Sequence, residues 1–252
     1  MTEKRTEPAQ DVIAGRNAVK EALRSARPIE SILVARGARN GSLGDIVSKA
    51  KAQGVAVKEV DPKRLEFLCP GANHQGIAAL AAAHEYASVE DMLALADERG
   101  EPPFLIVADE LNDPHNLGAI IRTANLAGAH GVIIPKNRAA GLTATVARTS
   151  AGALNYTPVA KVTNLAKTIE ELKKEGLWFV CADMGGTTMY DLNLKGPIGL
   201  VIGNEGEGVG RLVKEKCDMV ASIPMKGDID SLNASVAAGV LAYEIVRQRL
   251  QA

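Results

Sequence analysis

One carboxylate set among glycines is the first feature of this sequence that indicates chemistry. The segment IGLVIGNEGEGVG (198–210) places Glu205 between Gly203 and Gly206, directly after an apolar run. Its glycine spacing is not the G-x-G-x-x-G of dinucleotide-binding turns, and no Lys-Ser/Thr pair follows, as a phosphate-binding loop requires. The segment predicts a loop whose backbone approaches a ligand closely beside a carboxylate. A purely structural entry into the next helix is the alternative.

A lone arginine in an apolar stretch is the second feature. In LNDPHNLGAIIRTANLAGAHGVII (111–134), Arg122 interrupts a helical face formed by Ile120, Ile121 and Ala124. Such an arginine usually lies at the surface with its aliphatic stem against apolar neighbours. Its planar fork also suits bidentate binding of a phosphate, so both interpretations stay open. Three residues are able to cap the helix: Asn112, Asp113 and Asn116.

The third feature is the start of the last helix, in IPMKGDIDSLNASVAAGVLAYEIVRQRL (223–250). Ser231 is a candidate cap for this helix, and Asn233 is either a second cap or a contact to a ligand. Small residues follow at 234, 237, 238 and 239, and they allow a neighbouring helix to approach closely. That stripe fits a packing seam within one chain or between two copies.

These three segments belong to a region that alternates strands with helices. Apolar strands are predicted at 104–111, 131–135, 158–162, 177–182, 198–203 and 219–224. Helices are predicted at 116–128, 143–153, 164–175, 208–216 and 231–250. The alternation predicts an α/β domain with a mostly parallel sheet, whose ligands bind outside the carboxyl ends of the strands. Trp178, inside one of these strands, is expected in the core.

A smaller module precedes this region. Residues 12–82 alternate helix-like and strand-like segments, and residues 1–11 read as a flexible tail. Residues 83–102 form a linker with a helix at 88–99, and the second domain covers 103–252. Residues 1–82 carry 13 Lys+Arg against 9 Asp+Glu, a net charge of +4, whereas the whole chain carries −1. A basic first module fits a surface that binds phosphates.

Composition and the placement of cysteines and histidines argue against several classes of protein. The chain is 46% hydrophobic and 23% charged, as in ordinary globular proteins, and no apolar run approaches the ~20 residues that span a bilayer. Its beginning lacks a secretion signal, so we expect a cytoplasmic protein. Its three cysteines are far apart, and its four histidines form no ligand cluster. We therefore expect reduced thiols and neither zinc nor any other metal.

Taken together, the motifs carry a family resemblance. The segments N-x-G-A-I-I-R-T, G-N-E-G-E-G and S-L-N-A-S-V-A resemble the three signature motifs of the SpoU–TrmH branch of the SPOUT methyltransferases. The first module, from GRNAVKEAL to NHQGIAAL, resembles the ribosomal-protein-like substrate-binding domain of some members. In this combination the chain is most similar to the guanosine 2′-O-methyltransferases of large-subunit (23S) ribosomal RNA, the RlmB type.

The resemblance implies a trefoil-knotted catalytic domain that holds S-adenosylmethionine mainly through backbone groups of three loops. It also implies a homodimer packed through the catalytic domain, with ribosomal RNA as the partner and no membrane contact. By motif, the residues implied at the cofactor are Gly203, Ile223, Met225 and Leu232. The catalytic residues implied in the same way are Asn116, Arg122, Glu205, Ser231 and Asn233.

The implied reaction transfers a methyl group from the sulfonium to a ribose 2′-hydroxyl, which requires orientation of the hydroxyl and removal of its proton. Because arginine effectively never deprotonates in proteins, our hypothesis is that Arg122 clamps a phosphate and stabilises the developing alkoxide. Glu205 or a water would take the proton. The alternatives are the same chemistry on tRNA or another rRNA ribose, and a non-catalytic RNA-binding or ribosome-assembly protein. A nicotinamide oxidoreductase is disfavoured by the glycine spacing.

Overall fold

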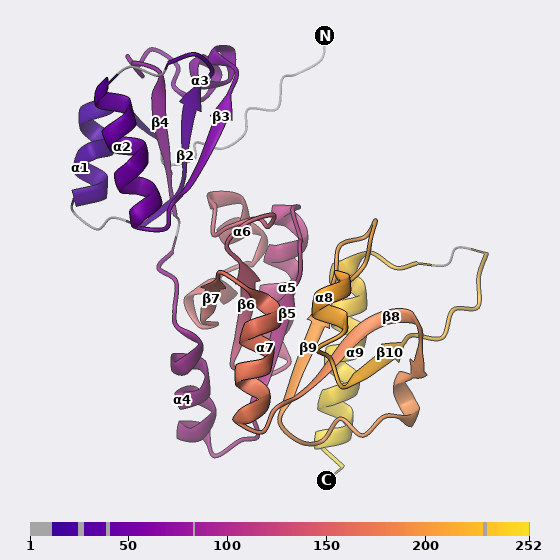
Figure 1. Ribbon diagram of the computed structural model, residues 1–252. Helices are drawn as coiled ribbons and strands as arrows, with labels where there is room; N and C mark the ends of the chain where they lie inside the picture. The colour runs from indigo at the N-terminus through magenta and orange to yellow at the C-terminus, as the bar shows by residue number, and fades with distance from the viewer. Residues whose placement is uncertain (1–11, 25–27, 39–40, 83, 229–230, 252) are drawn as a thin grey trace. The chain divides into compact units, whose positions relative to one another are not determined.

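Separate cores divide the chain into two units. The computed structural model describes residues 12–24, 28–38, 41–82, 84–228 and 231–251 (Figure 1), so the predicted tail, 1–11, lies outside the described residues. By its internal contacts the chain splits into an N-terminal unit, Met1–Glu85 with Gly141–Thr145, and a C-terminal unit, Tyr86–Ala140 with Val146–Ala252. No helix of the described segments is both long and apolar enough to cross a bilayer.

The N-terminal unit is a four-stranded mixed sheet with helices on both faces (Figure 1). Its strand order is β1-β4-β2-β3, in which β2 runs parallel to β3 and antiparallel to β4. Helices α1 and α2 share a core with one face of the sheet, and α3 packs on the other. The strands are β1 (Val12–Ala14), β2 (Ile29–Ala35), β3 (Ala56–Val60) and β4 (Ile77–Ala81). The helices are α1 (Arg16–Arg24), α2 (Gly41–Ala52) and α3 (Pro62–Leu68).

The C-terminal unit contains the predicted parallel sheet, which is confirmed. Its six strands follow the order β10-β8-β9-β5-β6-β7, and every neighbouring pair is parallel. The strands are β5 (Phe104–Ala108), β6 (Gly131–Pro135), β7 (Val159–Val162), β8 (Trp178–Thr188), β9 (Ile198–Ile202) and β10 (Met219–Ser222). The helices are α4 (Val89–Arg99), α5 (Pro114–Leu126), α6 (Ala144–Thr149), α7 (Leu165–Lys174), α8 (Arg211–Lys214) and α9 (Ala234–Arg249).

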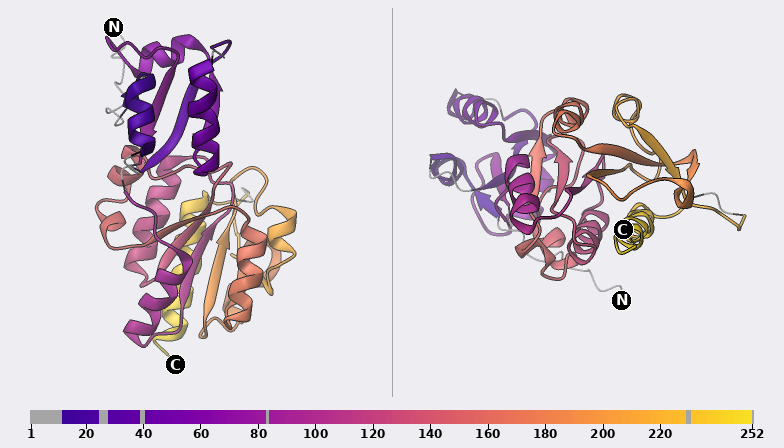
Figure 2. Two further views of the ribbon diagram at one scale, coloured as in Figure 1. Left: turned by 60° about the vertical axis from the view of Figure 1, so that its left-hand side comes forward. Right: turned by 90° about the horizontal axis from the view of Figure 1, so that it is seen from below.

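The central strands are buried because helices cover both faces of this sheet. All five residues of β5 and of β9 are buried, as their continuous apolar runs predict. Side chains of α4, α7 and α8 share one core with the sheet, whereas α5 and α9 pack together on the other face (Figure 2). The ligand-binding edge of such a sheet is therefore its carboxyl end, where the strands leave their helical cover.

Two expectations about this unit were wrong. Trp178 is 58% exposed because it is the first residue of β8, whereas Val180, which points to the same side of the strand, is buried. The helix predicted over 143–153 ends at Thr149, since Ala151 and Gly152 have φ values of +50° and +89°. A short 3₁₀ turn, Ala153–Asn155, completes that stretch.

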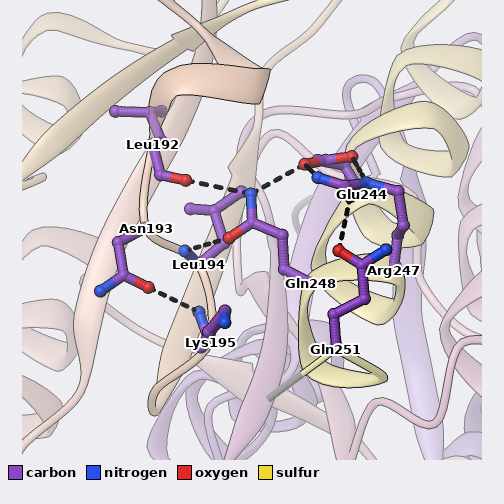
Figure 3. Close-up of polar contacts among 8 residues, drawn as sticks. All are labelled: Leu192, Asn193, Leu194, Lys195, Glu244, Arg247, Gln248 and Gln251. Atoms are coloured by element: carbon purple, nitrogen blue, oxygen red, sulfur yellow. Dashed lines mark hydrogen bonds and ion pairs between the residues drawn. The ribbon is translucent and has the colours of Figure 1, made fainter.

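A buried polar network fastens the end of α9 to the chain before β9 (Figure 3). The Gln248 side chain accepts a hydrogen bond from the backbone N–H of Leu194 (2.9 Å) and donates one to the carbonyl of Leu192 (3.0 Å). It also donates to Glu244 Oε1 (2.7 Å), and Arg247 donates twice to the same carboxylate at 2.8 Å. These bonds from Arg247 lower the pKa of Glu244. Each polar group of this buried cluster is thus satisfied, which holds α9 in a fixed position.

We predict that Gln248→Ala lowers the free energy of unfolding by about 2–4 kcal/mol, since buried partners lose their hydrogen bonds. Denaturant unfolding followed by circular dichroism measures the change. Gln251→Ala is the matched control, because Gln251 is exposed and accepts a single bond from Arg247 (2.9 Å). Its effect should stay within about 0.5 kcal/mol. Equal effects of both substitutions would contradict the structural role of the network.

Candidate active site

A cavity of about 260 Å³ opens at the carboxyl edge of the parallel sheet. Its wall comes from parts of the chain that are distant in sequence: the middle of β8, the loop after β9, the segment after β10 and the start of α9. Six residues singled out from the sequence line it: Gly203, Glu205, Ile223, Met225, Ser231 and Leu232. The cavity therefore lies where the strand–helix alternation places a ligand site.

The glycine-rich loop after β9 is folded tightly on itself. Asn204 and Gly208 exchange two backbone hydrogen bonds of 3.2 and 3.0 Å, and the Asn204 side chain accepts from the N–H groups of Gly206 and Glu207. A Cβ atom on Gly203 would lie 2.0 Å from the Gly208 carbonyl carbon. Glycine is needed at this position for closure of the loop itself, and not only for the approach of a ligand.

A buried aspartate anchors the far end of this loop. Asp109, directly after β5, is 4% exposed and accepts a hydrogen bond from the Gly210 N–H (2.8 Å). Burial raises the pKa of this carboxyl group. Asp109 was not among the predicted site residues, although a carboxylate at the end of the apolar run FLIVAD is a usable signal. Such a group needs a specific partner when it is buried.

Three predicted side chains form one hydrogen-bonded cluster at the cavity wall. The Asn116 amide donates to Glu205 Oε1. The Asn233 amide donates to Asn116 Oδ1 (3.0 Å) and to Glu205 Oε1 (3.2 Å). Of the three, Glu205 lines the cavity, and the two asparagines contact it from outside the lining. The cluster joins α5, the loop after β9 and the start of α9 at a single oxygen atom.

Asn233, and not Ser231, caps the last helix. Its Oδ1 accepts from the backbone N–H of Ser235 (3.0 Å) and from that of Val236 (3.4 Å). One asparagine thus performs both functions that the sequence left open, a cap through its oxygen and a site contact through its nitrogen. Ser231 is exposed in the preceding loop and lines the cavity. At α5 the cap is Asp113, whose side chain accepts from the His115 N–H (2.9 Å).

Arg122 is not brought to the cavity within one chain. It is exposed on α5 and is absent from the cavity wall. Six residues separate it from Asn116, which turns its side chain about 120° around the helix axis from that residue. Asn116 is 7% exposed and belongs to the buried face of α5. In the monomer, Arg122 is a surface arginine.

The cavity wall is acidic. Besides Glu205, it includes Glu207 and Asp183, neither of which the sequence analysis had singled out. Lys214 forms an ion pair with Asp183 (2.6 Å) and lowers the pKa of that carboxyl group. Carboxylates beside the apolar Ile223, Met225 and Leu232 suit a ligand with a positive centre and an apolar ring. In the described segments, no group of three His, Cys, Asp or Glu residues is placed to hold a metal ion.

A parallel α/β sheet with a cavity at its carboxyl edge defines the class as a ligand-binding α/β domain, here joined to a second small unit. Residues 103–243 match the SpoU rRNA Methylase family, and residues 12–87 match the family described as RNA 2′-O ribose methyltransferase substrate binding. The chain belongs to the SpoU rRNA methylase family, so the predicted family and the predicted pairing with a substrate-binding unit are confirmed.

Similar proteins agree with this membership. YacO of Bacillus subtilis, assigned to the TrmH family of tRNA/rRNA methyltransferases, is 48% identical over 241 residues, which cover 95% of this chain and 96% of YacO. The crystal structure of an AdoMet-bound rRNA methyltransferase from Sinorhizobium meliloti has a TM-score of 0.58 at 26% identity, covering 94% of this chain and 86% of that one. A TrmH/SpoU tRNA modifying enzyme of A. aeolicus has a TM-score of 0.55 at 28% identity, covering 60% of this chain and 77% of that one.

Proposed function

We propose that this protein transfers the methyl group of S-adenosylmethionine to the ribose 2′-hydroxyl of a guanosine in 23S ribosomal RNA. The observation that carries the proposal is Glu205, held by Asn116 and Asn233 at the wall of a cavity in a SpoU-family chain. In this scheme, residues 12–82 grip the RNA, residues 83–102 link the units, and residues 103–252 carry out the transfer in the cytoplasm.

The cavity fits the cofactor chemically. S-adenosylmethionine, when bound, supplies an electrophilic methyl group on a positively charged sulfonium. Glu205 and Glu207 provide negative charge for the sulfonium and the ammonium group, whereas the charge of Asp183 is already paired with Lys214. Ile223, Met225 and Leu232 offer apolar surface for the adenine ring, and Met225 and Leu232 are each 37% exposed around the opening. Backbone groups of the closed 203–208 loop complete the set of donors and acceptors.

Glu205 is suited to accept the proton of the 2′-hydroxyl. Both side chains that donate to its carboxylate, the amides of Asn116 and Asn233, bind the same oxygen, Oε1. The second oxygen accepts no hydrogen bond from any residue that the structure describes. A carboxylate oriented through one oxygen and open at the other is positioned to act as a general base.

We predict that Glu205→Gln lowers kcat by about 100-fold or more, because the amide keeps the shape of the side chain but cannot take a proton. The pH–rate profile should also lose its acidic limb, the part in which wild-type activity rises as the base deprotonates. Binding of S-adenosylmethionine, measured by isothermal titration, should change only a few-fold. A near-normal rate with an unchanged profile would remove Glu205 as the base.

A second copy of the chain is proposed to complete the site. Apolar side chains are exposed where α5 and α9 pack side by side: Leu126 (63%), Val236 (49%) and Tyr243 (50%). Exposed apolar groups along two adjacent helices are typical of a surface that another subunit covers. Arg122 is exposed on the same helix, so a symmetric dimer through this surface can place the arginine of one copy at the cavity of the other. There it would bind an RNA phosphate and stabilise the developing alkoxide.

We predict that Arg122→Ala and Asn233→Ala, each inactive alone, recover activity when they are mixed and allowed to exchange subunits. A mixed dimer then contains one site with both native residues, so about a quarter of the wild-type activity should return. Methylation assays before and after exchange measure the recovery, and Arg122→Ala mixed with itself is the control. Absence of recovery, with exchange verified by mass spectrometry, would place Arg122 outside the partner's site.

The N-terminal unit favours ribosomal RNA over tRNA. The rRNA methyltransferase structure covers 94% of this chain, whereas the tRNA modifying enzyme covers 60%. The family matched by residues 12–87 is also described as substrate binding. The same chemistry on tRNA or on another rRNA ribose is the alternative, since the name of the YacO relative includes both substrates. The intact cluster at Glu205 weighs against a non-catalytic RNA-binding protein.

The deciding experiment is a map of 2′-O-methyl groups on total RNA from cells with and without this protein. Our expectation is that one 2′-O-methylguanosine disappears from 23S RNA and returns when purified protein and S-adenosylmethionine are added. Loss of a tRNA ribose methyl group instead would change the substrate while keeping the chemistry. An unchanged map, together with no binding of S-adenosylmethionine in a calorimeter, would overturn the proposal.

A further inference from the structure

A basic groove on the N-terminal unit is the strongest feature outside the candidate active site. It lies between α1 and α2 and encloses about 570 Å³. Its charged residues are three cations, Arg16, Lys20 and Lys49, and a single acid, Asp45. The remaining lining residues are Asn17, Leu23, Ile46 and Gln75. The groove thus has positive walls, two amide side chains and a floor of two buried apolar residues.

The cations of the groove differ in their contacts. Arg16 is oriented by Gln75, since its backbone N–H donates to Gln75 Oε1 and its Nε donates to the Gln75 carbonyl, both at 3.2 Å. Lys20 and Lys49 form no ion pair with any residue in the described part of the chain, and this includes Asp45 across the groove. Uncompensated lysines beside a fixed guanidinium attract an anion.

The loop that holds Arg16 has a strained backbone. Gln75 adopts a φ of +49°, a left-handed conformation that costs a side-chain-bearing residue about 1 kcal/mol or more. Neighbouring hydrogen bonds hold this loop: the Gly15 N–H donates to the Ile77 carbonyl (3.1 Å), and the Gly76 N–H donates to His74 Nδ1 (3.1 Å). Strain of this kind persists where surrounding contacts fix it, and it gathers at binding sites.

We propose that this groove binds the phosphate backbone of the RNA substrate, an inference that rests on the proposed function. Arg16, Lys20 and Lys49 would contact phosphates, and the amides of Asn17 and Gln75 would donate to phosphate or sugar oxygens. No aromatic side chain lines the groove along the described residues, so it reads the charge and shape of a strand and does not stack bases.

The test compares two double variants of the full chain. Lys20→Ala with Lys49→Ala removes two cations from the groove. The matched control, Lys58→Ala with Lys63→Ala, removes two from the opposite side: Lys63 lies on α3, and Lys58 alternates with Val57, which packs toward α1 and α2. Binding of an unmodified 23S rRNA transcript is measured by filter retention at several salt concentrations.

The groove variant should bind about tenfold more weakly at 0.1 M salt, and the slope of log affinity against log salt should fall by about 1.5, the loss of two phosphate contacts. The control variant should stay within about twofold of the wild type. Asp45→Asn should act in the opposite direction and tighten binding about twofold to fivefold, because it removes the one acid of the groove. If all three variants change RNA affinity as expected, the results support the proposal that the groove binds RNA.

The outcomes separate this inference from the proposed function. If both double variants lose RNA affinity equally, or if the groove variant keeps its affinity, the proposal that the groove binds RNA is wrong. The methyltransferase proposal then stays in place. If the groove variant loses RNA binding as expected while the wild type methylates no RNA, the proposed function fails and the groove stands. Calorimetric binding of S-adenosylmethionine should be the same for all variants, because none of the altered residues lines the cavity.

Discussion

The site depends on one carboxylate oxygen, Glu205 Oε1, that accepts hydrogen bonds from two asparagine side chains. Asn116 lies in the first turn of α5, and Asn233 is the cap of α9. The two hydrogen bonds therefore form only when the starts of both helices lie next to the loop after β9. Glu205 itself is exposed, so these two hydrogen bonds act mainly by fixing the orientation of its carboxylate. Shifting either helix along its axis would therefore remove the donors on which the loop depends.

The rest of the C-terminal unit keeps these three segments in place. The parallel sheet is covered on both faces, and apolar side chains fill its core. Helix α9 contributes at both ends, through Asn233 at its beginning and through the Gln248 network near its end. Asp109 adds a further constraint by fixing Gly210, the residue where the glycine-rich loop ends. Contacts well outside the cavity thus fix the positions of α9 and of the glycine-rich loop at its wall.

Much of this arrangement was predictable from local sequence patterns. Continuous apolar runs identified the buried strands, and strand–helix alternation identified the parallel sheet with its polar edge. For residues 12–82 only an alternation of helices and strands was predicted, without bounds, and a strand as short as β1, with three residues, carries no periodicity. Pro62 after Asp61 was a usable helix-start signal for α3. The trefoil knot implied by the family resemblance stays a prediction.

Other features depend on the whole fold. The geometry of the turn decides between Ser231 and Asn233 as the cap, and the position of Trp178 at the very start of β8 decides its exposure. The place of Arg122 follows from helix phase: six residues after Asn116, it cannot share that buried face. A role for Arg122 in the active site therefore depends on association with a second copy of the chain. The sequence pattern of one chain carries no information about that association.

The internal bonding of the glycine-rich loop has a consequence for recognition. Because Asn204 and Gly208 already close the loop, and Asp109 already holds its end, little backbone freedom is left for a ligand to remove. Association then avoids much of the ordering entropy that a disordered loop would impose. A preorganised binding surface of this kind raises affinity by lowering that cost, without any additional contact to the ligand.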